Sequence, residues 1–248
     1  MNIIKWNDIS TFQSIFQNIR ITPLKEPEFC LTNPKWISKV TTYFGCDNEI
    51  ENNLLSYFKK KVNFIEAYHA TRLIIPTRLK REGLKKLSLE RIFKICENFD
   101  IKLPKSKKAI IIQNYNKYVS KRAGVRTNIY LEIDKYRNLF NESETQNKAC
   151  SYYRGSEAIS NVLDREDYLK YLQHPKASPV IIVIHLPYTE KFIHRSSMIS
   201  LANHFFASWY NFTFFSQGQF KCDMGLDIKS PIKSKYVQHI KIMNPNIN

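Results

Sequence analysis

The stretch SPVIIVIHLP, residues 178–187, constrains the fold more than any other part of this 248-residue chain. Aliphatic residues run without interruption from Val180 to Ile184, so a strand built from them is apolar on both faces. Such a strand must be covered on both faces and therefore lies inside a sheet. The run is far too short to cross a bilayer as a helix. We expect a central, buried strand in a globular protein.

The other segments mix strand and helix patterns without a regular strand–helix–strand order, which favours an α+β fold over a doubly wound α/β fold. Alternation predicts strands at 63–70, 127–133, 212–220, 226–229 and 236–243. Helical spacing predicts helices within 6–19, 76–83, 88–99, 107–121 and 196–210, and one entered near Ser156. The run Ile110–Ile112 would also suit a strand. Gly83 can end its helix as an αL cap, and Ser88 can cap the next one.

The formal net charge is +16, which predicts affinity for a polyanion: nucleic acid, an anionic membrane or an acidic protein. AT-rich coding would also raise the lysine content without any function. No acidic residue occurs from Ile101 to Leu131, and Tyr115 and Tyr118 are interleaved with the cations there. Cations with exposed tyrosines would bind phosphates and stack on unpaired bases; a merely solvated face is the alternative. The candidate nucleic-acid contacts are Lys105, Lys107, Lys108, Lys117, Lys121, Arg122 and Arg126.

Cysteine spacing and the N-terminus indicate where the protein acts. None of the five cysteines forms a C-x-x-C pair, so we expect reduced thiols and no metal. The first ten residues carry Lys5 and Asp8 where a signal peptide has an apolar run. We expect a cytoplasmic protein without a membrane span, in the producing cell or, for an effector, in a host cell. The sequence does not define an oligomeric state.

Three segments in a fixed order resemble a known family. YHATRLIIPTRLKREGL holds His69, Ala70 and Thr71 followed by a Gly-Leu pair; NIYLEID holds Tyr130; and KACSYYRGSE follows. Together they resemble the ADP-ribosyltransferase superfamily, in the His-Tyr-Glu branch of poly(ADP-ribose) polymerases and diphtheria toxin. Bacterial proteins with a His-Ala-Cys/Thr-Arg start are more similar still. The resemblance covers about residues 63–245.

This resemblance implies a split β-sheet core with peripheral helices. Residues 1–60 would be a helical or irregular segment packed on the core, and residues 61–248 the transferase-like domain, with a basic helical insertion at about 88–124. The substrate would be NAD, and nicotinamide would leave from its ribose carbon through an oxocarbenium-like state, for which rate comes from positioning and electrostatic support.

The resemblance also implies roles for particular residues. His69 would anchor the ribose, the backbone after it would hold the carboxamide, and two tyrosines would sandwich the nicotinamide. The implied NAD-binding residues are His69, Ala70, Thr71, Arg72, Tyr130, Tyr152, Tyr153 and Ser156. The position of the family's glutamate holds Lys235. Either Glu157 supplies the carboxylate beside the catalytic His69 and Tyr130, or catalysis uses no glutamate, or the protein does not catalyse.

Three functions follow as expectations. The first is an NAD-dependent mono-ADP-ribosyltransferase, as a toxin, effector or defence protein, that modifies RNA, DNA or an acidic protein. The second is an inactive module of the same fold that binds nucleic acid or a nucleotide. The third is a related RNA 2′-phosphotransferase, which uses NAD with arginine and histidine residues; the basic surface fits this function, but the tyrosines do not.

Overall fold

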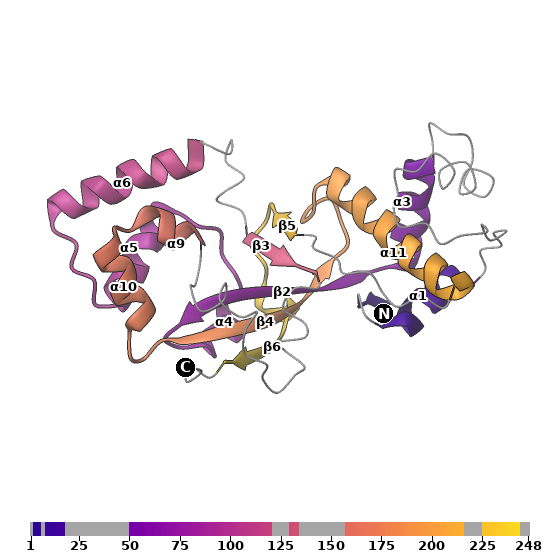
Figure 1. Cartoon of the computed structure of the whole chain (residues 1–248), viewed down its shortest axis with the longest axis horizontal. Helices are drawn as coiled ribbons and strands as arrows, with labels where there is room; N and C mark the ends of the chain where they lie inside the picture. The colour runs from indigo at the N-terminus through magenta and orange to yellow at the C-terminus, as the bar shows by residue number, and fades with distance from the viewer. Residues whose placement is uncertain are drawn as a thin grey trace.

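The computed structural model describes residues 2–5, 8–17, 50–120, 129–133, 157–215 and 225–243. Its sheet has the order β5-β3-β2-β4-β6. All pairs on this path are antiparallel, and β1 pairs in parallel with the start of β2 (Figure 1). The strands are β1 Ile3–Ile4, β2 Phe64–Leu73, β3 Ile129–Glu132, β4 Ser178–Pro187, β5 Gly225–Ile228 and β6 Val237–Ile242. The expected α+β class is therefore confirmed.

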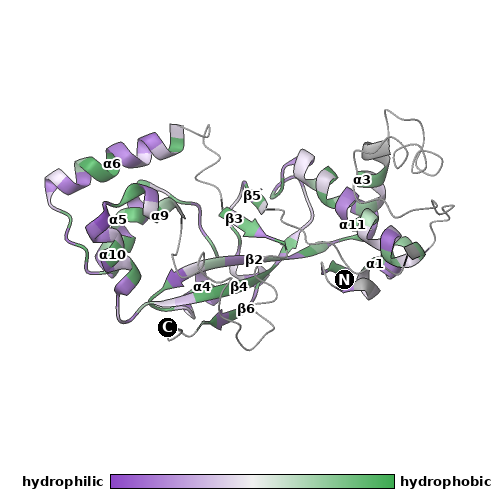
Figure 2. Cartoon of the chain, viewed as in Figure 1, coloured by the Kyte–Doolittle hydropathy of each residue, from purple (hydrophilic) through white to green (hydrophobic). Residues whose placement is uncertain are grey.

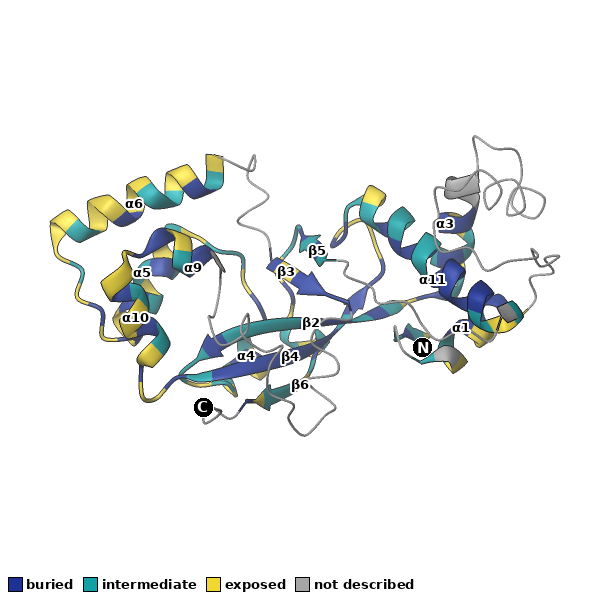
Figure 3. Ribbon diagram, in the orientation of Figure 1, coloured by how far each residue is buried: buried dark blue, intermediate teal, exposed yellow. Residues whose placement is uncertain are grey.

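Strand β4 is the covered strand that the sequence predicts. Every residue from Val180 to Ile184 is buried, and β4 pairs with β2 on one side and β6 on the other. Figure 3 shows β4 dark blue over most of its length, and Figure 2 shows hydrophobic green along its middle. The long β2–β4 pair is thus the rigid centre on which the remaining elements are placed.

Helices gather at the two ends of this sheet (Figure 1). At one end α1 Ile9–Phe16, α3 Ile50–Lys61 and α11 Arg195–Phe215 share the main hydrophobic cluster with the sheet. The rings of Phe58 and Phe205 stack there at 5.4 Å. At the other end α5 Leu89–Asn98, α6 Lys105–Ser120, α9 Glu157–Val162 and α10 Arg165–Gln173 enclose a second cluster. The short α4, Arg78–Glu82, follows β2, and the 3-10 helix η2, Ser234–Tyr236, precedes β6.

Several local predictions are confirmed. The helix predicted at 88–99 is α5, and the Ser88 hydroxyl caps it by accepting from the Arg91 N–H at 3.2 Å. Residues 110–112 are helical in α6, so the strand alternative is wrong. The helix entered near Ser156 begins at Glu157. It is followed by a second helix, because Asp164 caps α10 by accepting from the Asp167 N–H at 2.8 Å.

Two predictions need correction. Residues 212–215 continue α11 and do not start a strand; Phe214 packs one turn beyond Tyr210, with ring centroids 5.0 Å apart. Residues 216–220 of that predicted strand lie outside the described residues. Gly83 ends α4 with φ 70° but ψ −168°, so it is not an αL cap. It occupies the extended region at positive φ that is open almost only to glycine.

Candidate functional site

The β2–β3 ladder stops at His69. On the side of β2 away from β4, β1 pairs with Phe64 and Ile65, and β3 pairs at Tyr68. From His69 to Leu73 β2 still pairs with β4, but no strand among the described residues pairs with its other side. Among the described residues the β2–β3 pairing therefore ends here, and we call residues 69–73 the open edge of β2.

The backbone of Ala70 faces this open edge. Pro179, in β4, accepts from the Met243 N–H next to β6 at 2.9 Å. In an antiparallel strand the N–H and C=O of one residue point to the same side. The backbone carbonyl of Pro179 points to β6, so the backbone N–H and C=O of its β2 partner Arg72 point away from β4. Every second residue repeats this direction. Ala70 therefore turns one donor and one acceptor towards the side that β3 leaves uncovered.

His69 itself interrupts the ladder. In a continued register Ala70 would lie opposite Tyr130 and exchange two hydrogen bonds with it. Instead the Tyr130 carbonyl lies 2.8 Å from Nδ1 of the His69 ring. A carbonyl oxygen only accepts, so Nδ1 carries the proton and Nε2 of the neutral ring is an acceptor. The His69 side chain thus contacts the carbonyl that a continued ladder would have used, and its Nε2 is an acceptor.

Electrostatics keep the His69 ring neutral. Burial lowers the pKa of His69, the hydrogen bond to Tyr130 partly offsets this, and the positive charge of Arg91 lowers the pKa further. Arg91 lies in the first turn of α5. It was not among the residues singled out from the sequence, although its position three residues after the Ser88 cap places it at the start of a predicted helix.

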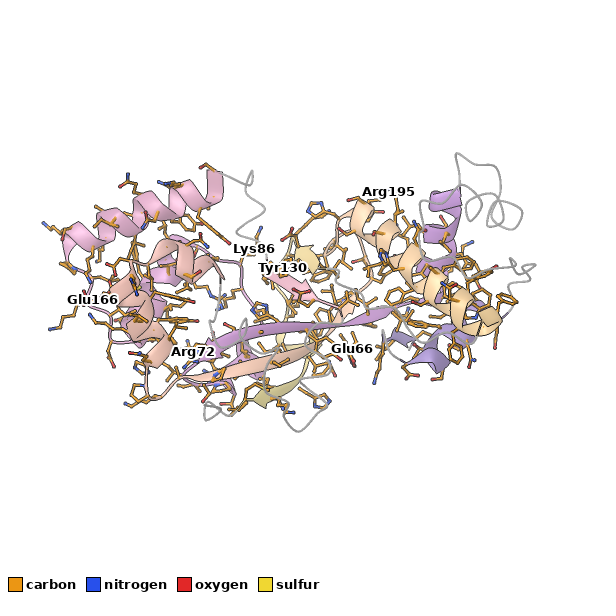
Figure 4. All side chains as sticks on the ribbon, in the orientation of Figure 1. Glu66, Arg72, Lys86, Tyr130, Glu166 and Arg195 are labelled. Atoms are coloured by element: carbon orange, nitrogen blue, oxygen red, sulfur yellow. The ribbon has the colours of Figure 1, made fainter. Side chains whose placement is uncertain are left out.

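The Tyr130 ring does not face His69 directly. Its side chain is 49% exposed and lies across Gly225, where an added Cβ would come within 2.1 Å of ring atom Cζ. Tyr130 and Gly225 therefore share one face, and the absence of a side chain at Gly225 gives the Tyr130 ring room over the backbone of β5. Figure 4 shows Tyr130 over the middle of β2, with Arg72 and Glu66 towards the two ends of that strand.

The other implied NAD-binding residues fall in different places. Thr71 lies on the open edge and is half-buried. Arg72 is 8% exposed and donates from Nη2 to the Ala177 carbonyl at 3.0 Å, so it joins β2 to the segment before β4. Tyr152, Tyr153 and Ser156 lie outside the described residues. So do three of the candidate nucleic-acid contacts: Lys121, Arg122 and Arg126.

Two carboxylates lie near Tyr130 on neighbouring strands. Asp227 is its direct partner in the β3–β5 ladder, and Glu132, two residues along β3, is only 6% exposed. Lys235 lies in η2, with Nζ 5.1 Å from the centre of the Tyr236 ring. Glu157 is the first residue of α9. The signal for Glu132 was present in the sequence as the alternation Tyr-Leu-Glu within the predicted strand.

A second charged group is buried on the Tyr68 side of β2. The Glu66 carboxylate accepts from the Tyr68 hydroxyl at 2.7 Å and lies 3.4 Å from Nε2 of His185. Lys5 Nζ is 3.8 Å away. Burial would raise the pKa of Glu66, but these hydrogen bonds and the charge of Lys5 lower it overall. The carboxylate is therefore ionised at neutral pH, with Lys5, the residue after β1, as its cationic neighbour.

The basic residues of α6 divide into two groups. Lys105, Lys108 and Lys117 are exposed, as Figure 3 shows by the mostly yellow α6. Lys107 instead bonds both oxygens of Asp167, at 2.8 and 2.7 Å, and that carboxylate is 2% exposed. Tyr118 is buried at 8% exposure, so the expected stacking on bases by Tyr118 is wrong; it packs α6 against the second hydrophobic cluster.

Comparison of the chain with protein-family models, with curated proteins and with solved structures finds no match. Within the described residues, no three His, Cys, Asp or Glu side chains are grouped so that they could hold a metal ion. The helices of the described ranges include none with the length and apolar character needed to cross a membrane.

Burial raises the pKa of the Cys96 thiol to about 11, which leaves it unreactive at neutral pH.

Proposed function

We propose that this protein is an NAD-dependent mono-ADP-ribosyltransferase whose substrate binds at the open edge of β2. The observation that carries the proposal is the interruption of the ladder at His69. A carboxamide presents one acceptor and two donors in a plane, which complements the N–H and C=O that Ala70 turns to this edge. Nicotinamide carries such a group.

His69 supports the same proposal through its protonation state. With the proton on Nδ1, the neutral Nε2 accepts a hydrogen bond from a ribose hydroxyl of the bound nucleotide. Tyr130, Asp227 and Glu132 lie on the other face of the sheet from the His69 side chain, so in this proposal they would reach the nicotinamide–ribose bond around the end of the β2–β3 ladder. Asp227 or Glu132 would hold the second hydroxyl and support the positive charge that develops at the ribose carbon. In this proposal they do the work of the glutamate that Lys235 replaces.

The test uses NAD labelled in its adenylate phosphate, offered with RNA, with single- and double-stranded DNA, and with cell lysate. We expect label transfer by the wild type and a decrease of at least about tenfold in His69→Ala, the equivalent of one hydrogen bond to a charged transition state. The matched control is His204→Ala. His204 also bonds a backbone carbonyl through Nδ1, at 2.7 Å from Ser200, but lies on α11.

The outcomes separate the proposals. Transfer by His204→Ala at the wild-type rate and loss in His69→Ala would support the site, and the labelled fraction would identify the acceptor. Glu132→Gln and Asp227→Asn then show which carboxylate acts. Absence of both transfer and nicotinamide release with every acceptor, or equal transfer by His69→Ala, would refute the proposal.

A binding module without catalysis is the second candidate, and the exposed lysines of α6 favour it. Binding of single-stranded RNA should weaken with salt, with a logarithmic slope of about −0.7 per phosphate neutralised. Replacing Lys105, Lys108 and Lys117 by alanine should therefore reduce the slope by roughly 2. Replacing Lys59, Lys60 and Lys61, in the last turn of α3, is the matched control. An unchanged slope in the α6 variant would exclude this surface.

A further inference from the structure

Strand β6 lies at one border of the sheet. It stands last in the strand order and pairs with β4 on one side, and no strand among the described residues pairs with its other side. Figure 1 shows it below β4, at the lower border of the sheet. The border of a sheet offers backbone donors and acceptors to which another extended chain can add as a strand.

The backbones of Ile240 and Ile242 turn to this outer side of β6. The Met243 N–H donates to the Pro179 carbonyl at 2.9 Å, so Met243 turns its backbone groups to β4. Every second residue repeats this direction, and the residues between them turn the opposite way. The register shift of the β4–β6 pair lies nearer the start of β6 and does not affect this part. Ile240 and Ile242 therefore each turn one N–H and one C=O outward.

The side chains of this segment alternate between the two faces of the sheet. Ile240 pairs with Ile182 and Ile242 pairs with Val180, so both isoleucines lie on the face of the main hydrophobic cluster. Ile240 is half-buried, whereas Ile242 is 57% exposed. Lys241, between them, lies on the other face. An added strand would therefore place one residue beside each isoleucine and, between these two, a residue beside the lysine on the opposite face.

The charge around β6 indicates what such a strand carries. No acidic residue occurs from Lys229 to Asn248, and this stretch holds four lysines: Lys229, Lys233, Lys235 and Lys241. Lys233 and Lys235, just before β6, are exposed. A second copy of the chain would bring two such lysine-rich segments together, and like charges on neighbouring strands are destabilising. A strand that carries carboxylates would be attracted instead.

We propose that the outer edge of β6 binds an extended acidic segment of a partner protein as an added strand. The main chain of that segment bonds the outward N–H and C=O groups of Ile240 and Ile242. Its apolar side chains cover the two isoleucines, and an aspartate or glutamate between them faces Lys241. The recognised pattern is thus apolar–acidic–apolar. Strands β4 and β2 separate this edge from the open edge of β2, so a bound segment and a nucleotide would not compete.

The experiment is fluorescence anisotropy with two short labelled peptides, one of alternating valine and glutamate and one of alternating valine and lysine. We expect the wild type to bind the valine–glutamate peptide, more weakly as salt is raised, and not the valine–lysine peptide. Ile242→Pro removes one outward N–H without breaking a hydrogen bond to β4. It should weaken the peptide by at least about tenfold and leave Tm nearly unchanged.

Two further variants separate the backbone from the side chain. Ile242→Thr keeps the N–H and suits a strand, but it loses apolar surface, so we expect a smaller loss of peptide affinity. Ile110→Thr is the matched control, because Ile110 is 49% exposed and lies on α6. The peptide should bind Ile110→Thr as it binds the wild type.

Each outcome decides the inference. No binding of the valine–glutamate peptide, equal binding of both peptides, or equal affinity in Ile242→Pro and the wild type would overturn it. If Ile242→Pro does not fold, Ile242→Thr decides: a loss absent from Ile110→Thr supports the edge, and no loss overturns it. A dimer in analytical ultracentrifugation that Ile242→Pro abolishes and the peptide does not displace would also overturn it, in favour of a second copy. Peptide binding by a protein that never turns over NAD would uphold this inference and refute the transferase.

Discussion

Replacing Gly83 by alanine should destabilise the protein strongly. An alanine Cβ at this position would lie 2.0 Å from the Ile232 carbonyl oxygen and 2.8 Å from the Ser234 nitrogen, both backbone atoms. Carbon–oxygen contacts are ordinarily no closer than about 3.3 Å, so the two segments must separate by about 1 Å. That separation breaks the two hydrogen bonds between Leu84 and Ile232, at 2.9 and 2.8 Å.

The two broken bonds cost about 2 kcal/mol, and an alanine in a backbone conformation reserved for glycine adds about 1–3 kcal/mol. The expected total is about 3–5 kcal/mol, or a decrease in Tm on the order of 10 °C for a chain of this size. Chemical unfolding with urea, followed by circular dichroism, measures the change directly. A loss below about 1 kcal/mol would show that the Leu84–Ile232 bridge can move without cost, and would refute the reasoning.

Three further predictions concern other parts of the structure. Gly225→Ala should displace the Tyr130 ring, which is a movable and half-exposed side chain. NAD affinity should therefore fall while Tm changes little. A large fall in Tm with normal NAD affinity would contradict this prediction. Because the folded-state pKa of Glu66 is lowered from 4.5, the stability it supplies is complete above pH 4.5 and lost as the pH falls through the lowered pKa. Glu66→Gln should flatten the fall of Tm below pH 4.5, and an unchanged acid profile would exclude the role. Lys107→Met leaves the buried Asp167 with Lys170, at 3.6 Å, as its remaining cation among the described residues. We expect the free energy of unfolding in urea to fall by about 2 kcal/mol. The RNA affinity of the folded variant should not change.

The sequence predicts the strands of the core well, for a clear physical reason. The aliphatic run from Val180 to Ile184 can be satisfied only inside a sheet, and the alternating segment before His69 pairs with it. Local capping was equally readable at Ser88, because a cap depends on residues within one turn. One error came at 212–215, where aromatic residues suit a strand as well as a buried helix, and helical packing against Tyr210 decides between them.

The site could be predicted only in part, since its geometry depends on contacts between distant segments. His69 was singled out from the sequence, but its hydrogen bond joins it to the carbonyl of Tyr130, 61 residues away. In the sequence Lys107 cannot be told apart from the other lysines of the basic run. Its carboxylate partner, Asp167, lies 60 residues along the chain and is brought beside it only by the fold. Arg91 was not singled out from the sequence, because its effect on the pKa of His69 exists only in the folded arrangement.

The open edge of β2 has a consequence for the behaviour of the protein in solution. A strand edge that offers backbone donors and acceptors is a template on which a strand of another molecule can add. This edge is short, residues 69–73, and within it Ala70 and Arg72 are the residues that turn their backbone groups away from β4. A short edge gives an incoming strand few hydrogen bonds, which limits self-association, and a ligand bound at Ala70 would reduce that number further.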